Sequence, residues 1–293
     1  MTEENSHAPA GLTGIGLRLF FFFLLEIVAL VVFGTFLDEL FGRLAAGAMG
    51  VFLAAVIANF LTVRIYERGR LEDVGMGWGP SSPRHLLLGA GAGVVAGALV
   101  SGALLVLGLA VWQPIPDSRF QLGRLLWVSA LLLFGAVGEE LLFHGYGFQL
   151  LLQSAGPKWI IPISAAIFGW AHHDNIAASP LGLVNTALWG LLLGYAFVRA
   201  GDLWLPIGLH FGWNWILPLF GANLSGFTLS LTGYTMEARG QQLWSGGAYG
   251  PEASLFTTVI AVALGLWLWK ARLGGPAVGS AEMEASSDET AHP

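Results

Sequence analysis

Two adjacent glutamates, Glu139 and Glu140, lie at the end of a long apolar run, where ionisable residues are costly and mark functional sites. Neighbouring residues on a helix point about 100° apart, so the two carboxylates cannot do the same job. Glu140 shares a helix face with His144, four residues further on, whereas Glu139 points elsewhere. The sequence therefore predicts different roles for the two acids.

Two further blocks place histidines inside apolar segments. Phe168 and His172 are four residues apart, as are His210 and Asn214, so each pair shares one helix face. Polar stripes of this kind face the interior of a bundle, because lipid offers them no hydrogen-bond partners. A lone histidine in a membrane is most often a hydrogen-bonding residue between helices. Three blocks that together supply acids, imidazoles and an amide favour one shared site.

Such a set of side chains is sufficient for hydrolysis. A glutamate can act as a general base toward water, and histidine and asparagine can donate hydrogen bonds to a developing oxyanion. Alternatively, one glutamate and two histidines can hold a zinc ion with one position open to water. The signatures HExxH and GxSxG do not occur, so the common soluble zinc-protease and serine-hydrolase motifs are absent.

The elements that position these blocks are apolar helices. The 293 residues are 55% hydrophobic and only 11% charged, whereas soluble domains have about 25% charged residues. Mean hydropathy is +0.68, and no cysteine is present. The composition predicts an all-α fold, a polytopic transmembrane helical bundle of about eight transmembrane helices. The predicted segments are 14–36, 44–64, 86–111, 122–152, 158–172, 181–199, 203–220 and 253–271.

We expect a polar, disordered N-terminus over residues 1–13, a transmembrane domain over 14–272 with a protease core at about 122–216, and an acidic, disordered tail over 273–293. The fourth segment is too long for one straight span and is predicted to tilt or to kink near Gly145 and Gly147. In the third segment, Gly89, Gly93 and Gly97 form a small-residue stripe that predicts close helix packing.

The distribution of lysine and arginine predicts the orientation in the membrane. With eight spans both termini share a side, and that side carries nine basic residues against four on the other. This bias favours cytoplasmic termini. The nine are Arg18, Arg64, Arg68, Arg70, Arg84, Lys158, Arg199, Lys270 and Arg272, and the four are Arg43, Arg119, Arg124 and Arg239. The longest loop, Ala222 to Pro251, is either a lid that contacts substrate or a plain connection.

The three blocks resemble the CPBP family of intramembrane proteases. That family contains the CAAX prenyl endopeptidases of the Rce1 type and the bacterial Abi (bacteriocin self-immunity) proteins. Its pattern is EExxxR, then FxxxH, then HxxxN or HxxxD. This chain reads EELLFH at 139–144, FGWAH at 168–172 and HFGWN at 210–214, in the same order. The resemblance covers about Leu122 to Ile216 and implies a membrane-embedded protease.

The resemblance also implies roles for individual residues. Glu139 matches the glutamate thought to activate the attacking water, and His172 matches the histidine that assists it. His210 and Asn214 match a pair read either as oxyanion donors or as part of a metal site. Glu139, His172 and His210 are then the candidate ligands of Zn²⁺ or another divalent metal, and a metal-free glutamate mechanism is the equal alternative. Glu140 is a supporting acid, with Phe168 and His144 beside the site.

The implied partners are a peptide or protein substrate in the membrane and the lipid bilayer, with no nucleic acid. The implied location is a multi-pass protein of the bacterial inner (plasma) membrane. One position departs from the family pattern, since His144 stands where the family has arginine, and histidine is a weaker, pH-dependent partner for Glu140. Four outcomes remain open: an active enzyme, a pH-tuned enzyme, a weakened or inactive relative that acts as a scaffold or a bacteriocin-immunity-type protein, or, least favoured, a protein in which His144 itself becomes a metal ligand. A proton-coupled transporter of small solutes is a further, disfavoured class, because no internal repeat stands out.

Overall fold

The computed structural model describes residues 11–116 and 120–273. The α-helices in these ranges are α1 (Leu12–Phe41), α2 (Arg43–Thr62), α3 (Ser82–Val106), α4 (Leu122–His144), α5 (Tyr146–Ala155), α6 (Pro157–Ala171), α7 (Pro180–Ala200), α8 (Trp204–Leu219), α9 (Gln242–Ser245) and α10 (Leu255–Lys270). Two strands, β1 (Ala110–Pro114) and β2 (Tyr234–Ala238), pair in antiparallel fashion. Short 3₁₀ or π turns cover Val63–Glu67, Leu71–Val74, Gly247–Tyr249 and Pro251–Ala253. The all-α prediction is confirmed, with a small sheet added.

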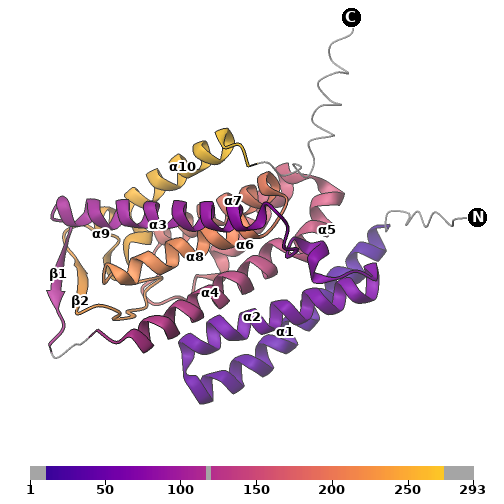
Figure 1. The fold of residues 1–293 in the computed structure, drawn as a ribbon, viewed down its shortest axis with the longest axis horizontal. Helices are drawn as coiled ribbons and strands as arrows, with labels where there is room; N and C mark the ends of the chain where they lie inside the picture. The colour runs from indigo at the N-terminus through magenta and orange to yellow at the C-terminus, as the bar shows by residue number, and fades with distance from the viewer. Residues whose placement is uncertain (1–10, 117–119, 274–293) are drawn as a thin grey trace, which may run out of the picture.

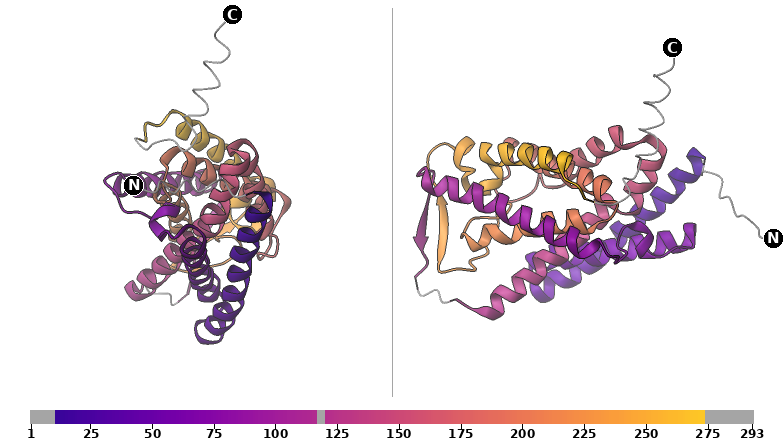
Figure 2. Two further views of the ribbon diagram at one scale, coloured as in Figure 1. Left: turned by 90° about the vertical axis from the view of Figure 1, so that its right-hand side faces the viewer. Right: turned by 45° about the horizontal axis from the view of Figure 1, so that its top comes forward.

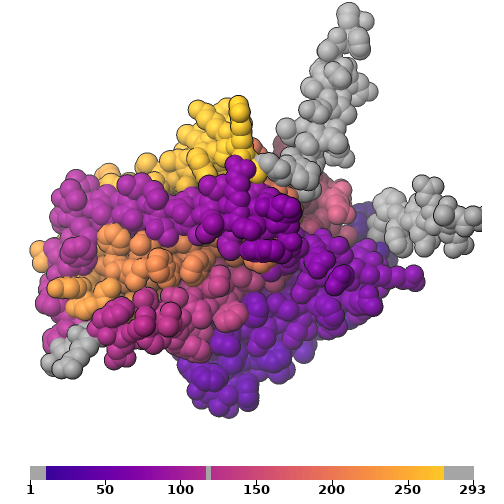
Figure 3. Space-filling model, in the orientation of Figure 1, coloured from indigo at the N-terminus to yellow at the C-terminus, as the bar shows by residue number. Residues whose placement is uncertain are grey.

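The long helices form a bundle whose two ends differ. The sheet of β1 and β2 closes one end, whereas the start of α1 and the short helix α5 lie at the other end (Figures 1 and 2). On the face shown in Figure 3, α10, α3, α8, α4 and the α1–α2 pair form successive bands. This order agrees with the helix contacts, in which α3 packs on α8, α8 on α4, α4 on α2 and α2 on α1.

Five helical segments in the described part of the chain are long and apolar enough to cross a membrane. They are Leu12–Phe41, Arg43–Glu67, Ser82–Val106, Leu122–Ala155 and Pro180–Ala200. Helix α1 exposes a row of large apolar side chains, including Phe20, Ile27 and Val31. An exposed apolar surface of this kind is suited to lipid rather than to water. Helices α6, α8 and α10 are shorter than these five, so the expected count of eight spans stays a prediction.

Predicted boundaries differ from the structure at several places. Helix α3 ends at Val106 rather than at residue 111, because Gly108 turns the chain with a φ of +69° and Ala110 begins β1. The predicted disordered N-terminus reached residue 13, but α1 already begins at Leu12. The other residues of the predicted polar ends, 1–10 and 274–293, lie outside the described residues, as does Arg119.

The predicted fourth helix is divided into α4 and α5 at Gly145, one of the two glycines where a kink was expected. Asn59 of α2 spans the break: its amide donates to the Leu141 carbonyl over 3.1 Å, and its oxygen accepts the N–H of Tyr146 over 2.7 Å. These bonds satisfy backbone groups that a helix end would leave unpaired. A Cβ at Gly145 would collide with the Asn59 side chain, so only glycine allows this approach.

Helix α8 is held against α3 by glycines on both helices. Cβ atoms at Gly89 and Gly93 would run into the carbonyl oxygens of Leu205 and Leu209, and a Cβ at Gly212 would run into the carbonyl oxygen of Ala90. The two backbones therefore approach as closely as small residues permit. The glycine stripe predicted from the sequence is confirmed as a packing surface, and it fixes the helix that carries His210.

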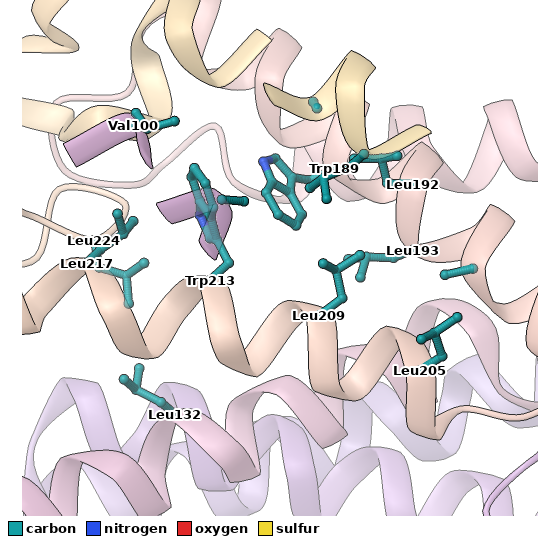
Figure 4. Packing of buried hydrophobic residues seen from close by; sticks show 14 of the residues in the cluster. Val100, Leu132, Trp189, Leu192, Leu193, Leu205, Leu209, Trp213, Leu217 and Leu224 are labelled. Carbon is teal, nitrogen blue, oxygen red and sulfur yellow. The ribbon is translucent and has the colours of Figure 1, made fainter. Parts of the chain in front are cut away.

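A second face of α8 packs into the apolar core. Leu205, Leu209 and Trp213 are buried there beside α7, and the rings of Trp189 and Trp213 lie 4.5 Å apart at 42° (Figure 4). Burial of large apolar side chains is the main favourable contribution to packing in this part of the protein. With glycines on one face and this core on another, α8 has little freedom to rotate.

The segment between α8 and α10 is folded rather than a plain connection. Its β2 strand pairs with β1 in the register Ala110↔Ala238 to Pro114↔Tyr234, and the Trp112 indole donates to the Phe220 carbonyl over 2.9 Å. Asn185 of α7, which is fully buried, donates to the carbonyls of Glu252 and Ser254 over 2.7 and 2.9 Å. These contacts fasten the segment across the end of the bundle, against the cavity described next.

Candidate active site

The structure brings Glu139, His172 and His210 together from three helical segments. Oε2 of Glu139 lies 3.9 Å from Nε2 of His172 and 3.8 Å from Nε2 of His210. Glu139 is on α4, His172 directly follows α6, and His210 is on the second turn of α8. Oε2 of Glu139 is buried and has no hydrogen-bond partner among the described residues. Buried polar atoms without a hydrogen-bond partner are rare in proteins, and a catalytic role is one of the explanations for them.

Glu140 lies on the other side of the same helix turn and is fully buried. Its two oxygens accept separate hydrogen bonds, from Nδ1 of His144 over 2.7 Å and from Nδ1 of His210 over 2.8 Å. A carboxylate can only accept, so both imidazoles carry their proton on Nδ1. In neutral His210 this leaves a lone pair on Nε2, the nitrogen that faces Glu139. Glu140 thus sets the tautomer and orientation of His210.

His172 is oriented in the same manner by the backbone. Its Nδ1 donates to the Phe168 carbonyl over 2.8 Å, which leaves Nε2 free to face Glu139. The Phe168 ring lies 4.7 Å from the His172 ring and 6.2 Å from the His210 ring, and it stacks edge-on against Phe143. Phe168 therefore forms an apolar wall that keeps both imidazoles in place.

The predicted topology did not explain how His172 and His210 could lie at the same depth in the bundle. Both α6 and α8 run away from the end that carries α5, and His172 is late on its helix whereas His210 is early. The break at Gly145 resolves this, because α5 extends the chain before α6 begins at Pro157. Helix α6 thus starts further out than α8 and ends at the depth of His210.

A cavity of about 520 Å³ contains this cluster. Glu139, His172, His210, Asn214 and Phe168 all line it, whereas Glu140 and His144 lie behind it and do not. Apolar side chains of α1, α2, α4 and α7 form most of the remaining wall, including Leu30, Leu44, Val51, Leu132 and Leu193. A mostly apolar cavity with a few convergent polar groups is the usual form of a substrate site.

The cluster does not fit a metal ion as it is arranged. Ligands about 2.1 Å from one tetrahedral zinc ion lie about 3.4 Å apart, whereas Oε2 of Glu139 lies 3.9 and 3.8 Å from the Nε2 atoms of His172 and His210. Across residues 11–116 and 120–273 there is no group of three or more His, Cys, Asp or Glu side chains that could hold a metal. This arrangement therefore suits a reaction in which side chains alone activate the water.

The segment that contains the site is similar to a known protein family. Residues 121–216 match the family described as type II CAAX prenyl endopeptidase Rce1-like. This match supports membership of the CPBP family for the segment that carries the three motif blocks. No curated protein and no solved structure matches it significantly. The matched Rce1-like segment runs from Gln121, just before α4, to Ile216 in α8, and so includes all three motif blocks.

The match also indicates a class of activity. Rce1-like proteins are CAAX-type intramembrane proteases, and the match together with the five long apolar helices supports a membrane-embedded hydrolase. The Rce1-like segment holds every motif residue that faces the cavity. It does not include Asn59, which spans the helix break, or the segment from Ala222 to Ala253, which covers the end of the cavity.

Two features of the Rce1-like site were missed by sequence reasoning. The spacing of Glu140 and His144 predicted their contact, but nothing indicated that Glu140 also holds His210, since this depends on which helix lies opposite. Glu252 also lines the cavity, in hydrogen-bond contact with Ser225. It comes from a loop without a spacing pattern, so its position becomes apparent only in the folded chain.

Proposed function

We propose that this protein cleaves a peptide bond of a membrane-associated substrate with a water molecule activated by Glu139. One observation supports the proposal above the others: Oε2 of Glu139 has no hydrogen-bond partner among the residues that the structure describes, and it faces Nε2 of both His172 and His210 inside a single cavity. All three atoms are acceptors when the imidazoles are neutral, so a water molecule between them would find partners for both of its protons.

In the proposed reaction Glu139 takes a proton from this water while the oxygen attacks the carbonyl carbon of the substrate. His172 orients the water by accepting its second proton as a hydrogen bond. The proton held by Glu139 then passes to the leaving nitrogen as the C–N bond breaks, so the products are a carboxylic acid and an amine. Positioned acid–base catalysis of this kind contributes about 10²–10⁴-fold to the rate.

The oxyanion that develops on the carbonyl is assigned to Asn214 and His210. The Asn214 amide can donate directly, whereas His210 can donate through Nε2 only when it is protonated, because its Nδ1–H is already bound to Glu140. The Glu140 carboxylate would stabilise that protonated form across 2.8 Å. One donor of this type is worth about 10²–10³-fold in kcat.

The test uses purified full-length protein and a quenched-fluorescence membrane peptide. Glu139→Gln and His172→Ala should each lower kcat/KM by about 10²-fold or more. His173→Ala is the matched control, since His173 is exposed, adjacent in sequence and stacked on Trp170 away from Glu139. Undiminished cleavage in Glu139→Gln or His172→Ala would sink the proposal.

The alternative function, a scaffold or immunity-type protein without catalysis, is motivated by His144 in place of arginine. His144 is buried against Phe148 and Gly194 and forms a hydrogen bond with Glu140. It occupies the position at which the family pattern has arginine, but an imidazole can be neutral whereas an arginine is always charged. His144→Arg should broaden the pH range of cleavage toward alkaline pH if the pair must be charged. A biological effect that survives Glu139→Gln would favour the scaffold.

We further propose that the protein lies in a bacterial inner membrane with both termini in the cytoplasm, as the excess of basic residues on that side favours. The chain has no cysteine, so a single introduced cysteine is a unique label. Arg70 directly precedes the Leu71–Val74 turn, which accepts a hydrogen bond from Gln149 of α5, whereas Glu237 lies on β2 at the opposite end of the bundle. A membrane-impermeant maleimide added to intact spheroplasts should label Glu237→Cys and not Arg70→Cys, and the reverse pattern would invert the orientation.

A further inference from the structure

Glu252 is a carboxylate of the cavity that belongs to none of the three motif blocks. It lies in the Pro251–Ala253 turn that precedes α10 and lines the same cavity as Glu139, His172 and His210. The chain places it there by folding the whole segment after α8 back over the end of the bundle. The catalytic scheme above does not use this residue.

The position of Glu252 is fixed rather than that of a mobile surface side chain. The backbone N–H and the hydroxyl of Ser225 both donate to its carboxylate, the hydroxyl over 3.2 Å. Asn185 holds the Glu252 carbonyl over 2.7 Å and itself accepts the hydroxyl of Thr258 over 2.7 Å. Ser225 has a φ of +48°, an uncommon value for a residue other than glycine.

Within the described part of the chain, no lysine, arginine or histidine forms an ion pair with this carboxylate. Burial raises the pKa of Glu252, and hydrogen bonds from Ser225 and Trp213 and the positive charge that His172 can carry offset only part of that effect. The other titratable groups that face it are His210 and Tyr249. A carboxylate without a partner cation in an apolar cavity is strongly stabilised by an arriving positive charge.

The carboxylate also keeps hydrogen-bonding capacity for a ligand. A carboxylate has about four acceptor sites, and the donors nearby are the two groups of Ser225 and the Trp213 indole. At least one site therefore remains for a ligand in the cavity. The apolar wall beside it, including Leu224 and Leu229, suits the methylene stem of a long basic side chain.

We propose that Glu252 is a specificity-determining residue that binds a lysine or arginine side chain of the peptide substrate close to the bond that is cut. This inference rests on the proposed protease function. It assigns to the segment after α8 the recognition of substrate, while the three motif blocks carry out the reaction.

The test compares matched peptides on the full-length protein. Each pair is identical except that one peptide has lysine and the other norleucine, an uncharged residue of similar length, at successive positions around the scissile bond. At one position the wild-type protein should cleave the lysine peptide with a kcat/KM about tenfold or more above its norleucine partner, the gain of one hydrogen bond to a charged group. This ratio should rise with pH as Glu252 loses its proton.

Glu252→Gln keeps an oxygen for Ser225 but loses the charge, and it should bring the lysine-to-norleucine ratio close to one at every pH. Glu252→Asp, a second variant in case the first is poorly folded, should keep part of the preference. Glu237→Gln, an exposed change on β2, is the matched control and should keep the wild-type ratio. A wild-type ratio near one at all positions, or an unchanged ratio in Glu252→Gln, would overturn the proposal.

Binding measurements separate this proposal from the protease assignment. Fluorescence anisotropy with the same labelled peptide pairs gives the lysine preference without turnover. Lysine-dependent binding that Glu252→Gln abolishes, in a protein that cleaves no peptide, would sustain the role of Glu252 and refute the protease. Cleavage that depends on Glu139 but shows no lysine preference would refute the role of Glu252 alone.

Discussion

Replacing Glu140 by glutamine perturbs two histidines at once without changing the shape of the side chain. Glu140 is fully buried and accepts the Nδ1–H of His144 and of His210 over 2.7 and 2.8 Å. Glutamine has one oxygen, so its amide nitrogen must face one of the two imidazole N–H groups. One imidazole then has to lose its hydrogen bond or move its proton from Nδ1 to Nε2.

The magnitude follows from that lost bond. A hydrogen bond to a charged partner contributes about 1.5–3 kcal/mol, which at 1.36 kcal/mol per factor of ten corresponds to roughly 10–150-fold in rate. If His210 loses its partner, the loss falls on the transition state, because His210 can no longer be held in its protonated form. We expect Glu140→Gln to lower kcat/KM by this factor and to lower Tm in detergent micelles.

The assay is cleavage of the membrane peptide, with Tm measured on the same samples. His144→Ala removes the other hydrogen bond but leaves Glu140 bound to His210, so it should lower Tm by a similar amount and kcat/KM by much less. Glu72→Gln, an exposed change, is the control for mutagenesis. A folded Glu140→Gln protein with wild-type kcat/KM, or with a loss no greater than that of His144→Ala, would refute the assignment of Glu140 as the positioning acid of His210.

Four other outcomes are expected. Gly93→Ala should reduce the free energy of unfolding by about 1–3 kcal/mol, because its Cβ would meet the Leu209 carbonyl oxygen. Gly91→Ala, where the new Cβ has open space, should be nearly neutral. Equal Tm values for the two variants would contradict the packing of α3 on α8. Glu26→Leu should raise the free energy of unfolding by about 1–3 kcal/mol, because both carboxylate oxygens of Glu26 are buried without a hydrogen-bond partner among the described residues. A lower Tm for Glu26→Leu would contradict this reasoning. Burial raises the pKa of Glu252 in the folded protein, so the folded state favours the protonated carboxyl. The resulting stabilisation is present below about pH 4.3, the ordinary pKa of glutamate, and is lost as the pH rises through the folded-state pKa. The Tm of the wild-type protein should therefore fall relative to that of Glu252→Gln between pH 4 and pH 8, and a parallel pair of curves would contradict this. Dialysis against a chelator should leave kcat/KM unchanged, and a loss restored by added Zn²⁺ would require a metal that rearranges the cluster.

The sequence is a good guide where a short-range pattern determines the structure. Apolar helices with one polar stripe must turn that stripe inward, so Glu139, His172 and His210 were expected to meet, and the structure brings them within 4 Å. The spacing of Gly89 and Gly93 likewise predicted a close helix contact, although not its partner. In each case the period of the helix carries the information.

The remaining features depend on contacts between distant parts of the chain. Pairing of β1 with β2 joins residues 110–114 to residues 234–238, and neither segment has a strong strand pattern of its own. A glycine marked the break after α4, but the asparagine that stabilises it, Asn59, lies on another helix. The position of Glu252 depends on the path of the whole segment before it, for which no local rule exists.

The glycine contact between α3 and α8 also bears on what can be transplanted. The segment that relates this chain to other proteins begins at residue 121, yet α8 rests on Gly89 and Gly93 of a helix that ends at Val106. A chimera that received residues 121–216 alone would expose the groove of Gly208 and Gly212 and leave the helix that bears His210 free to roll about its own axis. The segment that can be recognised by similarity is thus smaller than the segment that is needed to hold the site, and any graft of this candidate site must include α3 as well.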